Sequence, residues 1–376
     1  MYEHMLCKVE AMKILLLGEY SNVHATLADG LRKLGHQVTV ASNGDFWKDY
    51  PRDIDLKRDG GVGGAMLFAA RLAAALPHMR GYDVVQIINP MFLELKARRI
   101  RPIYDYLKHN NGKMVMGAFG MDYYWVHENI TRKPLRYSDF NIGGQLRTDT
   151  DAMKERRDWI GTDKEKLNRY IAEDCDAIVA GLYEYWACYH PVFPSKTNFI
   201  PFPIHMRMKT GDIPCQAPCP VKVFIGISKR RSTYKGTDIM LAAAQDLQQK
   251  YPERISLQVA CGIPFMKYKE MMNGADIILD QLYSYTPAMN ALEAMARGVV
   301  CVGGGEPENY SILRENKLKP IINVEPNYNS VYHQLEKVVL HPECIPMLKR
   351  DGLEYVNKHH DYMKVAAQYE KLYCAI

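Results

Sequence analysis

The chain has 376 residues, of which 47% are hydrophobic and 24% charged, with a formal net charge of +5. This composition is typical of a folded globular protein and excludes a disordered or fibrous chain. The length exceeds that of one ordinary domain and predicts two domains with a cleft between them.

The N-terminal segment and the cysteines indicate where the protein works. The first residues lack the basic start, apolar block and cleavage site of a secretory signal. No apolar run approaches the roughly 18 residues that span a bilayer. The nine cysteines are scattered and odd in number, which favours a reducing compartment. We therefore expect a cytoplasmic protein, either free or at the inner face of the membrane, with an extension outside the fold before Met12.

The first forty residues predict a strand, a helix and a second strand. KILLLG (13–18) is a short apolar run, the next segment has helical spacing at Val23, Leu27 and Leu31, and HQVTVAS (36–42) alternates as a strand does. Such an opening requires a parallel sheet with a right-handed crossover. Further strands are expected at 82–89, 113–120, 175–181 and 197–203, with helices between them.

Two glycine-containing segments of this half are candidate loops. GEYSNVH (18–24) follows the first strand but lacks the three-glycine spacing of a dinucleotide site, which disfavours hydride transfer. DGGVGGAM (59–66) is either a mobile loop on the acceptor side of the cleft or a plain turn leading into a helix.

A basic stretch, ELKARRIRPIYDYLKHNNGK (94–113), carries the main local concentration of positive charge. It is either a stripe that contacts anionic lipid headgroups or a solvated helix face. Nucleic acid is not an expected partner, because the basic residues are not interleaved with aromatic residues that could stack on bases.

The strand at 113–120 is followed by polar and aromatic residues. Asp122 and His127 stand where a catalytic base or an acceptor-binding group would face the cleft, and the neighbouring aromatic rings suit the apolar faces of sugars. We predict Asp122 first and His127 second as catalytic residues. The alternative for each is a capping or structural role.

Two patterns resemble metal sites in composition only. TDTD, with Asp149 and Asp151, lies in a polar stretch without a preceding apolar strand, and Cys215 and Cys219 stand among prolines without a second Cys/His pair. We expect neither a metal nor another cofactor.

The proline-rich stretch 201–221 predicts a domain boundary. Strands then recur at 221–228, 255–262, 275–281, 299–305 and 319–324, with helices at 236–251 and 288–298. We predict a first domain over 1–205, a second over 206–355 and a helix over 356–376 that crosses back to the first. Ligands of parallel sheets bind outside the carboxyl ends of the strands, so a substrate can lie between the two sheets.

Two places in the second half suit a phosphorylated ligand. The loop SKRRSTYK contains Arg230 and Lys235 just before a helix, which makes either an anion site or a solvated basic turn. Glu293 lies in a helix among small and apolar residues, and a buried carboxylate needs donors such as a ribose diol. Alternatively, Glu293 pairs with Arg297 one turn on. The segment 262–268 is where the base would be read.

YKGTDIMLAAA and ADIILDQLYSYTPAMNALEAMARGVVCVGGGEPE resemble the donor-domain signatures of GT-B fold glycosyltransferases, in the retaining group that contains sucrose synthases, glycogen synthases and mannosyltransferases. The order of the motifs matches that layout over nearly the whole chain. The resemblance implies an α/β fold of two Rossmann-like, doubly wound parallel-sheet domains facing a cleft.

The resemblance also implies roles for particular residues. Arg230 and Lys235 would bind the donor diphosphate with the loop at Gly18, and Glu293 would bind the nucleotide ribose. Tyr285 stands where that family usually has the first glutamate of an E-x7-E motif, which contacts the transferred sugar; Glu293 stands at the second. Either Tyr285 or Asp280 makes this contact, or the site has lost activity.

The predicted function is transfer of a sugar from a nucleotide diphosphate sugar to a glycan or lipid-linked acceptor in polysaccharide biosynthesis, with retention and without a metal. The alternatives are a non-catalytic nucleotide-sugar binding protein and a nucleotide-sugar epimerase on the same fold. The motifs do not distinguish the base, the sugar or the acceptor.

Overall fold

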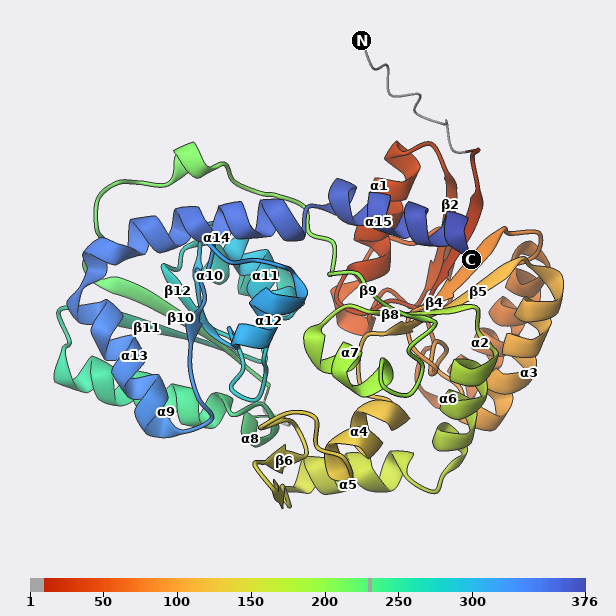
Figure 1. The fold of residues 1–376 in the computed structure, drawn as a ribbon, viewed down its shortest axis with the longest axis horizontal. Helices are drawn as coiled ribbons and strands as arrows, with labels where there is room; N and C mark the ends of the chain where they lie inside the picture. The colour runs from red at the N-terminus through yellow and green to blue at the C-terminus, as the bar shows by residue number, and fades with distance from the viewer. Residues whose placement is uncertain (1–9, 229–231) are drawn as a thin grey trace, which may run out of the picture.

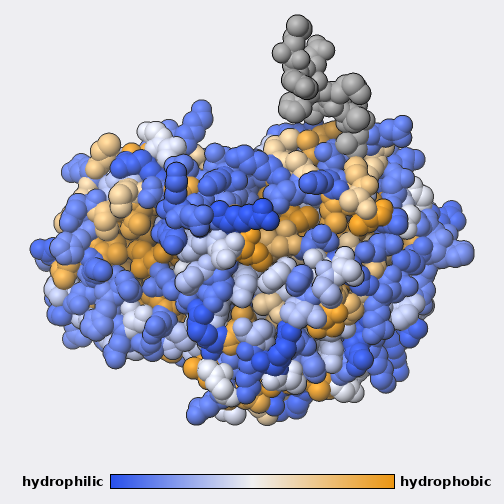
Figure 2. All heavy atoms as spheres, in the orientation of Figure 1, coloured by the Kyte–Doolittle hydropathy of each residue, from blue (hydrophilic) through white to orange (hydrophobic). Residues whose placement is uncertain are grey.

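The computed structural model describes residues 10–228 and 232–376, which form two α/β units side by side (Figure 1). Residues 13–199 form the N-terminal unit and residues 221–340 the C-terminal unit. Most of the face seen in Figure 2 is hydrophilic, with hydrophobic side chains showing between the polar ones.

The N-terminal unit is built on a seven-stranded parallel sheet in the order β3-β2-β1-β4-β5-β8-β9. The strands are β1 Lys13–Leu17, β2 Gln37–Ser42, β3 Ile54–Asp55, β4 Val84–Ile87, β5 Lys113–Ala118, β8 Ala177–Ala180 and β9 Thr197–Phe199. The apolar run Ile14–Leu17 is fully buried because β1 lies in the middle of the sheet. From β1 the chain adds β2 and β3 on one side, and it then adds β4, β5, β8 and β9 on the other. Because the crossovers are right-handed, this reversal places helices on both faces of the sheet.

The helices of this unit are α1 Val23–Lys33, α2 Gly61–Ala75, α3 Ala97–Asn110, α4 Tyr123–Ile130, α5 Thr150–Trp159, α6 Asp163–Asp174 and α7 Tyr183–Tyr189. Of the two alternatives for the segment 59–66, the structure agrees with the turn that leads into a helix. Its residues from Gly61 onward form the first turns of α2, because the run that follows them is rich in alanine and leucine, which favour helix.

A small hairpin of the N-terminal unit reaches across to the C-terminal unit. Its strands, β6 Asn141–Ile142 and β7 Gln145–Leu146, are too short for a periodic pattern and were not predicted. The hairpin lies close to α8 Ser232–Lys235 in Figure 1, where the Arg147 guanidinium donates to the carbonyl oxygens of Thr233 and Tyr234 at 3.0 and 3.2 Å.

The C-terminal unit contains a five-stranded parallel sheet in the order β11-β10-β12-β13-β14. Its strands are β10 Val221–Ile227, β11 Ile255–Cys261, β12 Ile277–Leu279, β13 Val300–Gly303 and β14 Ile322–Asn323. Its helices after α8 are α9 Thr237–Lys250, α10 Phe265–Asn273, α11 Met289–Met295, α12 Pro307–Ile312 and α13 Tyr328–Leu340. The alternation of strands and helices predicted from the sequence is confirmed in both units.

The C-terminal end of the chain joins the two units. Helix α14, Ile345–His359, lies over the C-terminal unit and α15, Tyr362–Ala375, crosses back onto the N-terminal unit (Figure 1). A Cβ at Gly30 of α1 would lie 2.6 Å from the Ala366 Cβ, so only glycine permits this close packing of α1 and α15. The Tyr373 hydroxyl donates to Gln86 of β4 at 2.7 Å. The predicted return of the C-terminal helix is confirmed.

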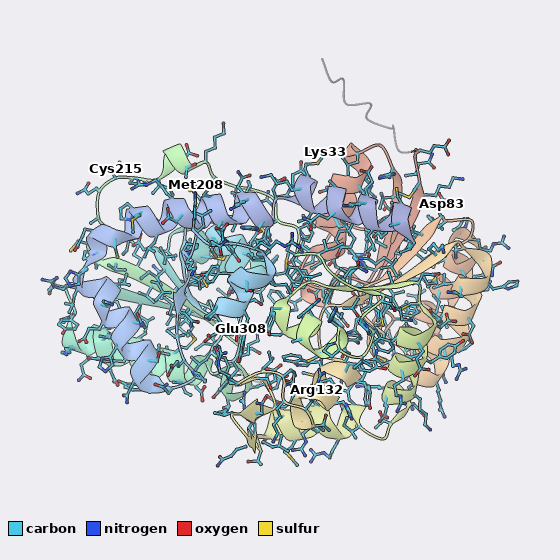
Figure 3. The ribbon with its side chains drawn as sticks, in the orientation of Figure 1. Lys33, Asp83, Arg132, Met208, Cys215 and Glu308 are labelled. Carbon is cyan, nitrogen blue, oxygen red and sulfur yellow. The ribbon has the colours of Figure 1, made fainter. Side chains whose placement is uncertain are left out.

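The linker between the units carries Met208 and Cys215 along the upper edge of the molecule (Figure 3). All eight described cysteines are free, and Cys215 and Cys219 are both exposed. Among the described residues, no group of three or more His, Cys, Asp or Glu side chains is placed to hold a metal ion. No helix in the described ranges is both long and apolar enough to cross a membrane.

Candidate functional site

Two cavities lie between the units, at the carboxyl ends of their strands. The larger cavity has a volume of about 510 Å³ and is lined by Tyr20, Ser21, Asp45, Lys48, Phe119, Gly120, Met121, Trp125, Asp139, Leu182, Glu184, Tyr185, Tyr234, Lys235, Gln281, Tyr283 and Ser284. The smaller cavity, of about 100 Å³, is lined by Ser21, Asn22, Thr26, Lys48, Tyr50, Ile204, His205, Arg207, Phe265, Tyr268, Lys269, Met272, Met289, Asn290 and Glu293. Ser21 and Lys48 line both cavities, so the two adjoin at these side chains.

Glu293 lies on α11 in the wall of the smaller cavity. Its side chain is 23% exposed, and one carboxylate oxygen lies 2.6 Å from the Arg297 guanidinium and 3.9 Å from that of Arg207. The pairing with Arg297 that the sequence offered as an alternative is present, and the carboxylate still lines the cavity, so its contact with a ribose remains a prediction.

The predicted base-reading segment also reaches the smaller cavity. Phe265 and Tyr268 of α10 line it, and Phe265 meets Trp47 and Tyr50 of the N-terminal unit edge to face, with ring centroids 5.4 and 5.8 Å apart. Aromatic side chains from both units thus enclose one end of this cavity, an arrangement that suits a planar base.

Lys235 lies at the end of α8 and lines the larger cavity. Burial raises the pKa of the Asp280 carboxyl, and the positive charge of Lys235 opposes this rise. The two side chains therefore lie near each other. Arg230, the second predicted phosphate ligand, lies outside the described residues.

Asp280 belongs to a hydrogen-bond chain that leads into the smaller cavity. Asn290 donates to an Asp280 carboxylate oxygen at 3.2 Å and accepts from the Tyr268 hydroxyl at 2.9 Å. Asp280 itself lines neither cavity. In this arrangement it positions Asn290, and its predicted contact with a sugar remains a prediction.

Tyr285 is buried against the N-terminal unit. Its hydroxyl accepts a hydrogen bond from the Arg136 backbone N–H at 2.6 Å, and its ring stacks on that of Tyr183 with centroids 6.1 Å apart. It lines neither cavity. The side chain predicted to contact the sugar is therefore engaged in holding the units together.

Glu184 was missed by the sequence analysis. This acid of α7 is 5% exposed, and its carboxylate accepts from the backbone N–H groups of Tyr285 and Thr286 at 2.7 and 3.0 Å. It also accepts from the hydroxyls of Ser284 and Thr286 at 3.0 and 2.6 Å. A carboxylate of one unit thus holds the loop that precedes α11 of the other.

A second set of polar contacts closes the same boundary. The Tyr137 hydroxyl donates to Glu306 at 2.6 Å, and the Arg136 guanidinium lies 2.6 Å from Glu306 and also pairs with Glu308. Glu308 is labelled at this boundary in Figure 3. These contacts are a second link between the two units, in addition to that of Glu184.

The loops after β1 and β2 carry the side chains shared by the two cavities. Ser21, Asn22 and Asp45 have left-handed backbones with φ of 53°, 71° and 57°, which is uncommon outside glycine and concentrates at functional sites. Asp45 accepts from the Ser21 N–H at 2.8 Å and from the Lys48 ammonium at 2.6 Å. Asp45 therefore holds Lys48 at the junction of the cavities.

Gly18 begins the first of these loops, with φ of 87°. Its N–H donates to the Ala41 carbonyl oxygen at 2.8 Å, so it is already paired within the sheet instead of facing a phosphate. A Cβ at this position would lie 2.3 Å from Ile88, which explains the glycine by packing. Tyr20 and Ser21 are the residues of this loop that line the larger cavity.

Glu19, beside Gly18, is almost fully buried at the start of α1. It accepts from the backbone N–H groups of His24 and Ala25 at 3.3 and 2.8 Å. Burial, with a smaller contribution from Asp45, raises the pKa of Glu19 from 4.5 to about 8. The carboxyl group occupies helix amides that a phosphate would otherwise use.

The raised pKa of Glu19 predicts a pH dependence of stability. A carboxyl with a higher pKa in the folded than in the unfolded chain stabilises the fold at low pH, and this stabilisation is lost as the pH rises through the folded value. The free energy of unfolding of the wild type, relative to Glu19→Gln, should therefore fall by about 3–5 kcal/mol between pH 5 and pH 9. Urea denaturation of both proteins across this range measures the difference between their free energies of unfolding. If this difference stays constant with pH, the pKa of Glu19 is the same in the folded and the unfolded chain.

Asp122 and His127 lie away from the cavity walls. Asp122 is buried and caps α4, accepting from the Trp125 N–H and the Tyr189 hydroxyl, each at 2.8 Å. Burial raises its pKa to about 7. His127, on the last turn of α4, stacks on Tyr123 and lies 3.1 Å from Glu128. Both take the structural alternative that the sequence left open, and neither lines the larger cavity.

Asp149 of the TDTD pattern has structural partners. It caps α5 through the Ala152 N–H at 3.0 Å and pairs with the Arg147 guanidinium at 3.0 Å. The Arg147 guanidinium also lies 3.8 Å from the centre of the Tyr283 ring. This acid therefore supports the hairpin that contacts α8.

Known structures resemble this chain in fold over almost its whole length. A sucrose-phosphate synthase from Thermosynechococcus elongatus aligns with a TM-score of 0.59 at 14% identity, covering 97% of this chain and 98% of that one. HepE from Anabaena aligns with a TM-score of 0.59 at 12% identity, covering 97% of this chain and 100% of that one. The catalytic domain of starch synthase IV from Arabidopsis thaliana aligns with a TM-score of 0.56 at 9% identity, covering 97% of this chain and 99% of that one. No protein-family profile matches the chain, and no curated protein matches its sequence. The chain has the GT-B fold, as the motifs predicted.

Proposed function

We propose that this protein is a cytoplasmic glycosyltransferase that moves a hexose from a nucleotide diphosphate sugar to a glycan or lipid-linked acceptor, with retention and without a metal. The observation that carries the proposal is the pair of adjoining cavities between the units, with Glu293 in the wall of one and Lys235 in the wall of the other. One ligand that spans both cavities would contact the acid Glu293 in the smaller cavity and the cation Lys235 in the larger one.

The cavities suggest how the donor lies. We place the nucleoside in the smaller cavity, with the base near Phe265 and Tyr268 and the ribose against Glu293. The sugar then occupies the larger cavity, and the diphosphate lies at the junction beside Lys48 and Ser21, within the field of Lys235. Lys48 is a phosphate ligand that the sequence analysis did not include.

The electrostatics of this placement suit a transfer reaction. Negative charge grows on the diphosphate as the sugar departs, and an enzyme gains rate by stabilising charge that develops in the transition state. Lys48 and Lys235 line the larger cavity from opposite units, so they would provide the stabilisation that a metal gives in other enzymes. In a retaining reaction the departing phosphate itself assists removal of the acceptor's proton.

The ligands of the structural neighbours support the choice of donor. HepE was crystallised with UDP and glucose and with UDP-glucose, and starch synthase IV with ADP and acarbose. These two proteins bind different bases, so the fold accepts both. We therefore propose that this chain also binds a nucleotide diphosphate sugar. The binding panel described next identifies its base.

A binding panel followed by a turnover assay tests the proposal. Thermal unfolding with UDP, GDP and ADP should show one nucleotide that raises the Tm with increasing concentration, since a ligand of the folded state alone stabilises it. Sugar nucleotides of that base should then release the nucleoside diphosphate only when an acceptor is present. Binding without release would make the protein a nucleotide-sugar binding protein, conversion of the donor without an acceptor would make it an epimerase, and no binding at all would contradict the proposal.

A further inference from the structure

Helix α2 exposes an apolar face to solvent. Val62, Met66, Ala69 and Ala73 recur at helical spacing on its outer side, with Leu67 and Ala70 beside them, and we call these six residues the α2 face. Val62 is 80%, Met66 71% and Leu67 46% exposed. The opposite side of the helix, with Phe68 and Leu72, packs into the core. A surface helix of a globular protein normally has a polar outer side, and an exposed apolar face typically marks a binding surface.

The α2 face carries no charged residue of its own. The single charged side chain of this fully described helix, Arg71, is turned along the helix, where it donates to the Lys57 carbonyl oxygen at 3.0 Å and lies 3.8 Å from Asp59. The exposed residues of α2 therefore present carbon atoms alone.

Exposed cations lie beside the start of this apolar face. Arg58, just before α2, donates to the Glu94 carbonyl oxygen at 2.9 Å, and Tyr106 of α3 donates to the Leu76 carbonyl oxygen at 3.2 Å. These two contacts place α2 and α3 alongside each other, running in the same direction. Arg99 lies on the same side of α3 as Tyr106, two turns earlier. Lys57, Arg58, Arg98 and Arg99 are all exposed, and we call them the basic rim.

Lys96, just before α3, is also exposed, and the cations further along the stretch 94–113 have partners. Lys108 and Lys113 lie 3.2 and 3.6 Å from Asp176, and the Arg101 guanidinium lies 3.9 Å over the Tyr170 ring. The nearby acids also have partners, since Asp105 accepts from Tyr170 at 2.8 Å and Glu94 accepts from Asn43. The available positive charge is therefore concentrated at the start of α3, beside α2.

We propose that the α2 face and the basic rim together dock the protein on an anionic lipid bilayer. Val62, Met66 and Leu67 would enter the boundary between headgroups and acyl chains, while the rim arginines contact lipid phosphates. A second copy of the chain is a poorer occupant, because a symmetric contact would bring the basic rim close to its own copy.

This docking also relates the membrane to the cleft. Helices of a parallel α/β unit begin at the edge of the sheet where the strands end, and α2 follows β3 at that edge. Val62 and Met66, near the start of α2, therefore lie on the cleft side of the unit. If the proposed transferase activity holds, the docked protein presents its larger cavity near the bilayer, where a lipid-linked acceptor resides.

Vesicle flotation tests the docking without any assay of activity. The wild type should float with vesicles of phosphatidylcholine and phosphatidylglycerol, and less with phosphatidylcholine alone or at high salt. The double variant Val62→Glu/Met66→Glu should reduce the bound fraction about tenfold on anionic vesicles. Arg98→Glu/Arg99→Glu should cause a comparable loss, since each basic residue near an anionic surface contributes about 1 kcal/mol.

A matched pair of substitutions controls for added negative charge. Val192 and Met347 are 41% and 53% exposed, and Val192→Glu/Met347→Glu should float as the wild type does. All the substituted positions are exposed, so the Tm of each variant should stay near that of the wild type. Equal flotation of wild type and both test variants would overturn the proposal. So would a wild-type dimer that Val62→Glu/Met66→Glu converts to monomers without any flotation, because the α2 face would then bind a second copy.

Discussion

Replacing Lys235 with alanine should lower kcat/KM for the nucleotide sugar by about 100- to 1,000-fold, the usual effect of removing one group that stabilises transition-state charge. Lys235 lines the larger cavity near Asp280, at the carboxyl end of β12. Its ammonium would lie beside the diphosphate as the bond to the sugar breaks, so the loss should fall mainly on kcat. Steady-state kinetics with the donor identified by the binding panel measures it.

Ligand dissection separates this role from a general structural effect. Lys235→Ala and Lys48→Ala should each weaken binding of the nucleoside diphosphate in calorimetry while leaving binding of the nucleoside unchanged, since neither lysine would touch the base or ribose. Lys267→Ala provides the matched control, because Lys267 is exposed on α10 of the same unit and lines neither cavity. An equal loss for nucleoside and diphosphate, or no loss for either variant, would contradict the placement of the diphosphate at the junction.

That Lys235 and Glu293 line the cleft could be predicted from the sequence because their positions follow from local patterns. Lys235 stands just before a helix whose start is predicted by Gly236 and Thr237. Glu293 is the one acid in a helix of mainly small and apolar residues. Parallel strands bring their carboxyl ends to one edge, so residues that follow strands share the cleft even when they are about 60 positions apart. The fold class follows from the same alternation of apolar strands and amphipathic helices.

The residues that close the cleft could not be found in this way. Glu184 stands one residue into a short helix, and its partners Ser284, Tyr285 and Thr286 are a hundred positions away. The hairpin residue Arg147 similarly donates to carbonyl oxygens of α8. Such pairings depend on how two separately folded units meet, and no local periodicity encodes that contact.

Asp122 shows how one position can suit two different roles. An acid at the end of a strand, next to aromatic residues, suits a catalytic base, but the same position is also the ideal cap of the helix that follows. The structure gives both oxygens of this carboxylate to Trp125 and Tyr189. A sequence cannot distinguish the two uses, because both require an acid just before a helix at the carboxyl edge of the sheet.

Glu184→Ala should lower the free energy of unfolding by about 2–4 kcal/mol, because it leaves the buried N–H groups of Tyr285 and Thr286 without their acceptor. Glu184 also lines the larger cavity, so water can enter and offset part of this loss. Glu184→Gln retains one oxygen that can accept from both amides and should lose about half as much. Equilibrium denaturation in urea gives the three values.

The same substitution also tests whether the clamp controls access to the cleft. Glu184 belongs to the N-terminal unit and its four donors to the C-terminal unit, so Glu184→Ala should favour separation of the units and increase the radius of gyration measured by X-ray scattering. In the proposed placement a nucleotide diphosphate would contact both units, so it should restore the compact form by binding the closed arrangement better than the open one. Asp163→Ala, at a side chain that is 60% exposed on α6, should leave the radius unchanged. If Glu184→Ala loses stability but keeps the wild-type radius with and without nucleotide, Glu184 holds only its own loop, and the contacts of Arg136, Tyr137 and Arg147 are sufficient to keep the units together.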